Sequence, residues 1–197
     1  QSLENPQTQE LYQELEESVW QISDTMREEG DYYLVEEIVL EGTIPEEQIR
    51  MAIIAFKNDN PQVFWLTNLY WRSYTGDTTR IQLYSYVSEW ERDWMQQELQ
   101  AEIEGILSGL PADLEELDRE IYLFDAVSQG CVYDNEAAQD PSQWEAYTSY
   151  GALVQGEAVC EGYARAMQQL LSYAGMRCRL VHGTAGGESH MWNLVEV

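Results

Sequence analysis

The sequence predicts an α+β protein, with helices concentrated in its first part and strands at its end. Three observations indicate this class. Apolar residues recur at helical spacing in several segments, two aromatic and β-branched runs flank a turn, and two strand-like runs close the chain. Helices and strands that occupy separate stretches of a chain are typical of α+β folds.

Two amphipathic helices are predicted in the N-terminal part. The first covers about residues 7–28 and ends at Gly30. Its apolar residues follow one another at intervals of four, four and three: Leu11, Leu15, Val19 and Ile22. The second lies within "GTIPEEQIRMAIIAFKNDNP", where Thr43 is the expected N-cap, Pro45 starts the first turn and Pro61 follows the end.

A β-hairpin is predicted in "VFWLTNLYWRSYTGDTTRIQLYSYV", where two aromatic and β-branched runs flank "TGDT". The sequence leaves open whether this hairpin is a lobe of its own or an edge of one sheet. Two more helices follow, at about residues 90–107 and 113–129. The residues expected to face inward are Trp94, Met95, Leu99, Ile106 and Leu110 in the first, and Leu114, Leu117, Ile121 and Phe124 in the second.

The chain closes with an irregular stretch, a helix and two strands. No regular pattern extends from Tyr133 to Gly156. The helix, about residues 160–174, has Gly175 at its C′ position. It is expected to bury Ala164, Met167, Leu170 and Leu171. The strands "RCRLVHG" and "HMWNLVEV" are joined by "TAGGES".

Composition excludes several classes of function. The chain has 197 residues, 44% of them hydrophobic, which is enough for a packed core. Its net charge of −26 repels phosphates and anionic lipids, so we expect neither nucleic acid nor a membrane surface as partner. The chain contains no run of about 18 apolar residues, so no membrane span is predicted. The opening "QSLENPQTQ" predicts a mature or trimmed chain from which any signal or anchor has been removed.

Cys160 opens the last predicted helix, in "GEAVCEGYARAMQQLLSYAGMRC". A helix N-terminus favours a thiolate and can hold an oxyanion, and a neighbouring imidazole can take the thiol proton. Of the two histidines we expect His190 to be this base, because strand parity places His182 with Cys178 and Leu180 on a face expected to be core. A cysteine in an apolar helix is also often a packing residue, so the residues alone leave both roles open.

The other two cysteines carry no comparable signal. Three cysteines are too few for a disulfide framework, and they lack metal-ligand spacing. Cys131 and Cys178 are expected to be small buried hydrophobic residues. A redox-sensing role, with one of them as the resolving partner of Cys160, is a weaker alternative.

The block "YGALVQGEAVCEGYARAMQQLLSYAGMRCRLVHG", followed by "HMWNLVEV", resembles the transglutaminase-like superfamily in its bacterial, protease-like branch. Members carry a valine-cysteine-x-glycine-tyrosine-alanine run and, after a helix and a strand, histidine-x-tryptophan-asparagine. The resemblance covers about residues 117–197, including "REIYLFDAVSQGCVYD". It implies a transglutaminase-like core over residues 113–197, cut short at its C-terminal end, after a helical extension with the hairpin over residues 1–112.

The resemblance also implies a papain-like core, in which a nucleophile helix packs on an antiparallel sheet. By position, Cys160 matches the nucleophile and His190 the general base. The family's third residue, an aspartate on the next strand, would lie beyond Val197. Glu196 is a poor substitute, because six residues along the histidine's own strand place it roughly 20 Å away. The thiol–imidazole pair needs no metal or other cofactor, and no "D-x-D-x-D-G" calcium loop occurs.

Four neighbours complete the expected site. Gln155 and Tyr150 precede Cys160 by five and ten residues and are candidates to hold the oxyanion. Tyr163 and Trp192 flank the pair and are expected to wall the site.

The resemblance implies thiol-dependent acyl transfer on a protein or peptide amide, through a thioester at Cys160; cell-wall peptide is one candidate substrate. Hydrolysis by a cysteine peptidase or amidase and glutamine–lysine crosslinking share the first half-reaction, and the bacterial branch favours hydrolysis. The alternative is a catalytically incomplete module that binds a peptide or a surface. A secreted or cell-surface bacterial protein is expected, rather than a cytoplasmic one.

Overall fold

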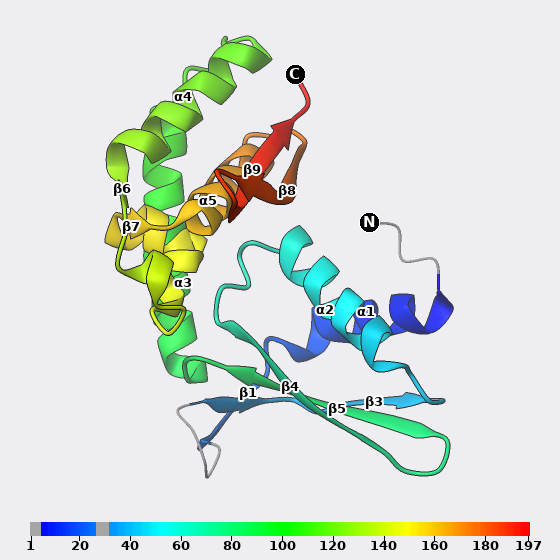
Figure 1. Ribbon diagram of the computed structural model, residues 1–197. Coiled ribbons are helices and arrows are strands. Elements are labelled where there is room, and N and C mark those ends of the chain that lie inside the picture. Colours follow the sequence, from blue (N-terminus) through cyan, green and yellow to red (C-terminus); the bar gives the residue numbers. More distant parts are fainter. Residues whose placement is uncertain (1–4, 27–31) are drawn as a thin grey trace. The chain divides into compact units, whose positions relative to one another are not determined.

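The computed structural model describes residues 5–26 and 32–197, and it confirms the predicted α+β class (Figure 1). The chain forms two compact units, Gln1–Trp94 and Met95–Val197. Their boundary falls inside helix α3 (Glu89–Ser108). Across the described residues, no helix combines the length and the apolar character that a membrane crossing requires.

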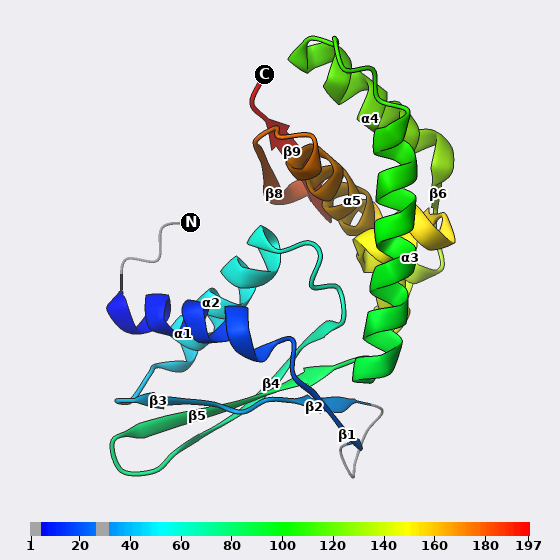
Figure 2. The ribbon, with the colours of Figure 1, turned by 180° about the vertical axis from the view of Figure 1, so that it is seen from behind.

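The first unit is an antiparallel five-stranded sheet with two helices on one face (Figures 1 and 2). Its strands are β1 (Ile22–Met26), β2 (Tyr33–Val35), β3 (Ile38–Glu41), β4 (Leu66–Tyr74) and β5 (Thr78–Ser85). β5 pairs with β4 along one edge, and with β3 and β2 along the other. Helices α1 (Pro6–Ser18) and α2 (Glu46–Asp59) pack against each other on the sheet. The core is formed by buried residues that include Leu11, Leu15, Ile49, Phe56, Trp65 and Ile81.

The predicted first helix is too long. α1 ends at Ser18, and the chain continues into strand β1. The indole N–H of Trp65 donates to the carbonyl oxygen of Val19 at 3.0 Å, and Ile22 pairs with Val35 in the sheet. Pairing in the sheet therefore overrides the helical spacing of these apolar residues. The predicted end at Gly30 lies outside the described residues.

The predicted cap of the second helix is also wrong. α2 has Pro45 at its N-cap, and no side chain caps it. The turn before it is held from the sheet, because the Thr79 hydroxyl accepts from the Ile44 N–H at 3.0 Å and donates to the Gly42 carbonyl oxygen at 2.6 Å. Thr43 is left exposed at the surface.

The predicted hairpin is confirmed as β4–β5. The Thr75 N–H donates to the Thr78 carbonyl oxygen at 3.0 Å, and Gly76 between them has a positive φ of 61°. β4 pairs only with β5 among the described strands, and β5 lies inside the five-stranded sheet, so the hairpin is part of the sheet of the first unit.

The second unit is built around helix α5 (Cys160–Tyr173). Helix α4 (Glu116–Gly130) packs against α5, and so does the hairpin of β8 (Cys178–Ala185) and β9 (Glu188–Val195). Between α4 and α5 the chain forms short elements: β6 (Val132–Tyr133), η1 (Ala137–Gln139), η2 (Trp144–Tyr147), η3 (Gly151–Gln155) and β7 (Glu157–Ala158). The expected arrangement, a cysteine-initiated helix on an antiparallel sheet, is present with two strands in the described part of the chain.

The β8–β9 hairpin presents two different faces. Its turn is Gly186–Gly187, whose positive φ values of 63° and 92° favour glycine. Met191 is buried, and the Asn193 side chain donates to the Ala164 carbonyl oxygen of α5 at 2.9 Å, so this face meets α5. By strand alternation, His190 lies on the other face.

Two predicted inward faces need correction. In α3, Met95 and Leu99 are buried as expected, but Trp94 is exposed. In α4, the predicted inward row is exposed instead: Leu117, Ile121 and Phe124. Leu123 and Val127 are the buried residues of this helix. α4 carries apolar residues on two sides, so their spacing does not indicate which row is buried. Its packing on α5 buries the row that contains Leu123 and Val127.

Candidate active site

Cys160 is the first residue of α5, and it is partly exposed. The backbone before it is anchored, because the Val159 N–H donates to the Ala146 carbonyl oxygen at 3.0 Å. The first turn of α5 also packs closely on η2, because a Cβ at Gly162 would lie 2.5 Å from the Ala146 carbonyl oxygen. Element η2 therefore braces the start of α5, where the first backbone N–H groups have no partner within the helix.

A short parallel strand pair brings Tyr133 beside this helix start. The Val132 N–H donates to the Gly156 carbonyl oxygen at 2.8 Å, and the Asp134 N–H donates to the Ala158 carbonyl oxygen at 2.9 Å. The chain after α4 is thus fixed alongside the residues that lead into Cys160.

The Tyr133 hydroxyl lies next to the backbone N–H of Cys160. Burial raises the pKa of the Tyr133 phenol, the nearby Cys160 thiol and Glu188 raise it further, and a hydrogen bond with the Cys160 N–H lowers it. The Tyr133 ring is stacked on Tyr163, with ring centroids 6.5 Å apart. With its pKa raised above the usual value, Tyr133 keeps its proton at neutral pH and can donate a hydrogen bond.

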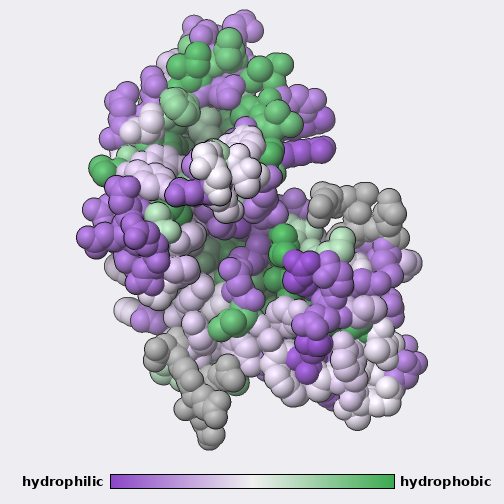
Figure 3. Space-filling model, in the orientation of Figure 1, coloured by the Kyte–Doolittle hydropathy of each residue, from purple (hydrophilic) through white to green (hydrophobic). Residues whose placement is uncertain are grey.

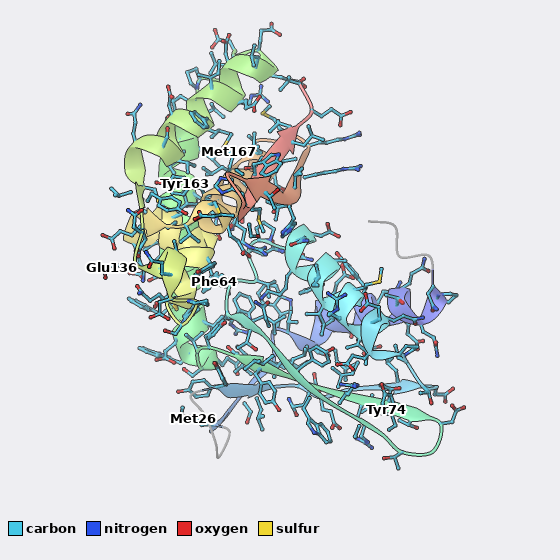
Figure 4. All side chains as sticks on the ribbon, in the orientation of Figure 1. Met26, Phe64, Tyr74, Glu136, Tyr163 and Met167 are labelled. Atoms are coloured by element: carbon cyan, nitrogen blue, oxygen red, sulfur yellow. The ribbon has the colours of Figure 1, made fainter. Side chains whose placement is uncertain are left out.

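A cavity of about 400 Å³ opens beside Cys160, where α4, α5 and β9 meet. Its lining residues are Phe124, Val127, Ser128, Tyr133, Cys160, Tyr163, Ala164, Met167, His190, Met191, Trp192 and Asn193. Figure 4 labels two of these side chains, Tyr163 and Met167, on α5. Cys160 and His190, thirty positions apart in the sequence, both line this cavity.

His190 reaches the cavity from the edge of β9. Side chains along a strand alternate between its two faces, yet four consecutive residues, His190–Asn193, line the cavity. The cavity therefore lies along the edge of the strand, where side chains from both faces can reach it. The imidazole lies 6.2 Å from the Trp192 ring, between ring centroids. His182 is exposed, pairs with Met191 across the hairpin and does not line the cavity.

Residues 104–197 match the family model of the transglutaminase-like superfamily. This part of the chain belongs to that superfamily. Its members typically carry out cysteine-dependent acyl transfer. The chain is also similar to a solved protein described as "Crystal structure of a TGase", with 15% identity and a TM-score of 0.44 over 82% of this chain. The chain spans about half of that protein, 48% of its length. No curated protein matches the sequence.

His190 has no orienting side chain among the described residues. In residues 5–26 and 32–197, no side chain forms a hydrogen bond or ion pair with His190. Glu196 is exposed and forms an ion pair with Arg177 at 3.4 Å. Nor do three His, Cys, Asp or Glu side chains come together as a metal site anywhere in these residues.

Of the four predicted neighbours, Tyr163 and Trp192 line the cavity. The Tyr163 hydroxyl donates to the Cys131 carbonyl oxygen at 2.6 Å. Gln155 and Tyr150 are not brought to the cavity: Gln155 is exposed at the end of η3, and the Tyr150 hydroxyl donates to Glu98 at 2.7 Å. Burial and this hydrogen bond raise the pKa of Tyr150.

Cys131 and Cys178 have surroundings unlike those of Cys160. Cys131 is buried and Cys178 is half-buried, and all three thiols are free. Burial raises the pKa of Cys131 and of Cys178. Both thiols should therefore react more slowly than an exposed cysteine at neutral pH.

Several residues that line the cavity could not be identified as site residues from the sequence pattern. Tyr133 follows a helix and belongs to a two-residue strand, too short for any periodicity to predict its pairing. Phe124 and Met167 read as ordinary core residues of their helices. The "YD" of the family resemblance was the available pointer to Tyr133.

Proposed function

We propose that this protein transfers acyl groups from protein or peptide amides, with Cys160 as nucleophile and His190 as general base, and that water is the acceptor. The observation that carries the proposal is the cavity that both residues line, at the N-terminus of α5. Membership of residues 104–197 in the transglutaminase-like superfamily supports the same chemistry.

In the proposed first half-reaction, His190 takes the proton of the Cys160 thiol, and the sulfur attacks the amide carbonyl carbon. The C–N bond then breaks as His190 returns the proton to the leaving amine, which leaves a thioester at Cys160. In the second half-reaction, water attacks the thioester carbonyl carbon and His190 takes its proton. The C–S bond then breaks as His190 returns the proton to the sulfur, which releases the carboxylic acid and restores the Cys160 thiol.

The negative oxygen of the tetrahedral intermediate needs hydrogen-bond donors. We assign this role to the Tyr133 hydroxyl, whose oxygen accepts from the Cys160 N–H and whose own proton can be donated to the intermediate. Gln155 and Tyr150 are less suitable for this role, since neither lines the cavity.

Water as the acceptor is favoured by the resemblance to the protease-like branch of the superfamily. The substrate is then a protein or peptide, with cell-wall peptide as one candidate. A location outside the cell fits such a substrate.

Alkylation of Cys160 by iodoacetamide at different pH values tests the pair, with Cys131 and Cys178 as internal controls in the same digest. In the wild type we expect Cys160 to react well below pH 8. In the His190→Ala variant this low-pH reaction should fall by about tenfold or more, because no imidazole accepts the proton. His182→Ala is the matched control and should behave as the wild type. Equal alkylation profiles in wild type and His190→Ala would refute the pair.

Tyr133→Phe separates oxyanion stabilisation from thiol activation. We expect hydrolysis of a peptide amide to fall by roughly 100-fold, because one oxyanion donor is lost. Alkylation of Cys160 by iodoacetamide forms no oxyanion and should change little. If both rates fell together, Tyr133 would act by placing Cys160 instead.

A second candidate function is peptide binding without turnover. The observation that favours it is that no side chain among the described residues forms a hydrogen bond that would orient His190. Loss of an orienting group lowers the activity of a thiol or hydroxyl nucleophile by orders of magnitude. Binding of a peptide that is unaffected by His190→Ala, with no hydrolysis in either protein, would support this candidate.

A further inference from the structure

We infer that the cavity beside Cys160 takes a bulky apolar side chain, carried by the residue whose carbonyl group reacts; the inference rests on the proposed function. It names the class of acyl donor, which neither the superfamily nor the reacting pair specifies.

The imidazole of His190 is the one basic side chain among the described residues that line the cavity. None of the twelve described residues that line it is Asp, Glu, Lys or Arg, in a chain of which 23% is charged. Apolar walls come from all three elements: Phe124 and Val127 from α4, Met167 from α5, and Met191 and Trp192 from β9. Apart from that imidazole, a charged side chain entering this space would lose its hydration without meeting an opposite charge.

Several polar groups of the lining already have partners. The Ser128 hydroxyl donates to the Phe124 carbonyl oxygen at 2.7 Å. The Asn193 amide donates to the Ala164 carbonyl oxygen, and the Tyr163 hydroxyl donates to Cys131. A glutamine side chain in the cavity would therefore find few free hydrogen-bonding groups, and burying an unpaired amide is costly.

The dimensions suit one side chain. Cys160 lies at one end of the lining and Met167 two turns further along α5, roughly 10 Å away at helix rise. A volume of about 400 Å³ lies near the lower end of the range for small-molecule sites, about 300–1,000 Å³. The cavity thus has room for a leucine or phenylalanine side chain whose carbonyl group stays beside the sulfur.

Two of the walls are apolar and still partly exposed. Phe124 is 59% exposed and Trp192 is 42% exposed. Figure 3 shows hydrophobic surface over α4, to which Phe124 belongs. An apolar side chain in the cavity would remove these rings from water, which is the expected driving force for its binding.

N-acetyl aminoacyl chloromethyl ketones that carry Leu, Phe, Ala, Gln or Glu side chains test the inference. Each alkylates Cys160 as the C–S bond forms and chloride leaves. The second-order rate at Cys160, measured by peptide mass spectrometry, is divided by the rate with free glutathione. We expect the Leu and Phe reagents to exceed the Ala reagent by about 10-fold to 100-fold, with Gln and Glu no faster than Ala. Equal rates across the series, or faster reaction of Gln or Glu, would overturn the inference.

Phe124→Ala and Ile121→Ala form a matched pair on α4. Both residues are exposed, so neither change should unfold the protein, but only Phe124 lines the cavity. We expect Phe124→Ala to lower the Phe-to-Ala rate ratio by about threefold to tenfold, and Ile121→Ala to leave it unchanged. A ratio that Phe124→Ala leaves unchanged would contradict the assignment of this wall.

Failure of the inference and failure of the proposed function give different results. The chloromethyl ketones react with a thiol directly, so their side-chain preference can be measured without any amide turnover. The proposed function fails if alkylation at Cys160 is independent of His190, whatever that preference is.

Discussion

Helices α4 and α5 pack against each other, yet they are held in the fold very differently. α5 is buried over most of its length, from Gly162 to Leu171 apart from Tyr163. α4 buries Leu123 and Val127, while its Leu117–Ile121–Phe124 row is exposed. The helix that begins with Cys160 is thus fixed from several sides, whereas the helix that supplies one cavity wall is held along one.

The difference shows which part of the site is rigid. A nucleophile must be held close to its reacting geometry, and burial along α5 together with the brace at Gly162 provides this. A wall that contacts only a substrate side chain needs less support. We therefore expect substitutions in α5 to lower the free energy of unfolding, whereas substitutions on the exposed face of α4 should change it little.

The largest contrast is expected between Leu170→Ala and Leu117→Ala. Leu170 is 0% exposed in α5, and Leu117 is 56% exposed in α4. Removing the buried side chain leaves a cavity and should lower the free energy of unfolding by about 3 kcal/mol, whereas Leu117→Ala should change it by less than about 0.5 kcal/mol. Urea-induced unfolding measures both. A similar loss in the two variants would mean that the α4 row is covered in solution.

A smaller contrast is expected between Gly162→Ala and Gly130→Ala. A Cβ at Gly162 would meet the Ala146 carbonyl oxygen at 2.5 Å and the Ala158 Cβ at 2.8 Å, whereas a Cβ at Gly130 would meet no atom within 4 Å. Gly162→Ala should lower the free energy of unfolding by about 2 kcal/mol through overpacking. Gly130→Ala, in α4, should be neutral or stabilising by about 0.5 kcal/mol. Hydrogen exchange of the α5 amides should detect the first change, and unaltered exchange there would argue against the brace.

The same two helices show how far the sequence could predict the structure. α5 has a clear apolar row and a glycine after its end, so its start, its end to within one residue, and the burial of Ala164, Met167, Leu170 and Leu171 were predicted correctly. The burial of its polar residues Arg165, Gln168 and Gln169 was not predicted. α4 has apolar residues on two sides, so spacing identified the helix but not the face that packs. The first helix was extended through Ile22 because its spacing is helical, and only the pairing with Val35 shows that this residue belongs to a strand.

The candidate site was predicted in part for a similar reason. Cys160 and His190 were named as candidates because a recognisable motif surrounds each of them, and the structure places both along one cavity. Tyr133 was not assigned a role, because its place beside Cys160 depends on the parallel pairing of two-residue strands. Such pairing depends on tertiary packing, and no local pattern encodes it.

The exposed row of α4 also bears on how this protein can evolve. Phe124 is separated in the sequence from both reacting residues, and replacing an exposed residue costs little stability. Mutation can therefore reshape this wall of the cavity while the packing that holds Cys160 is kept. Lineages that share the same chemistry would then diverge in substrate preference first along α4.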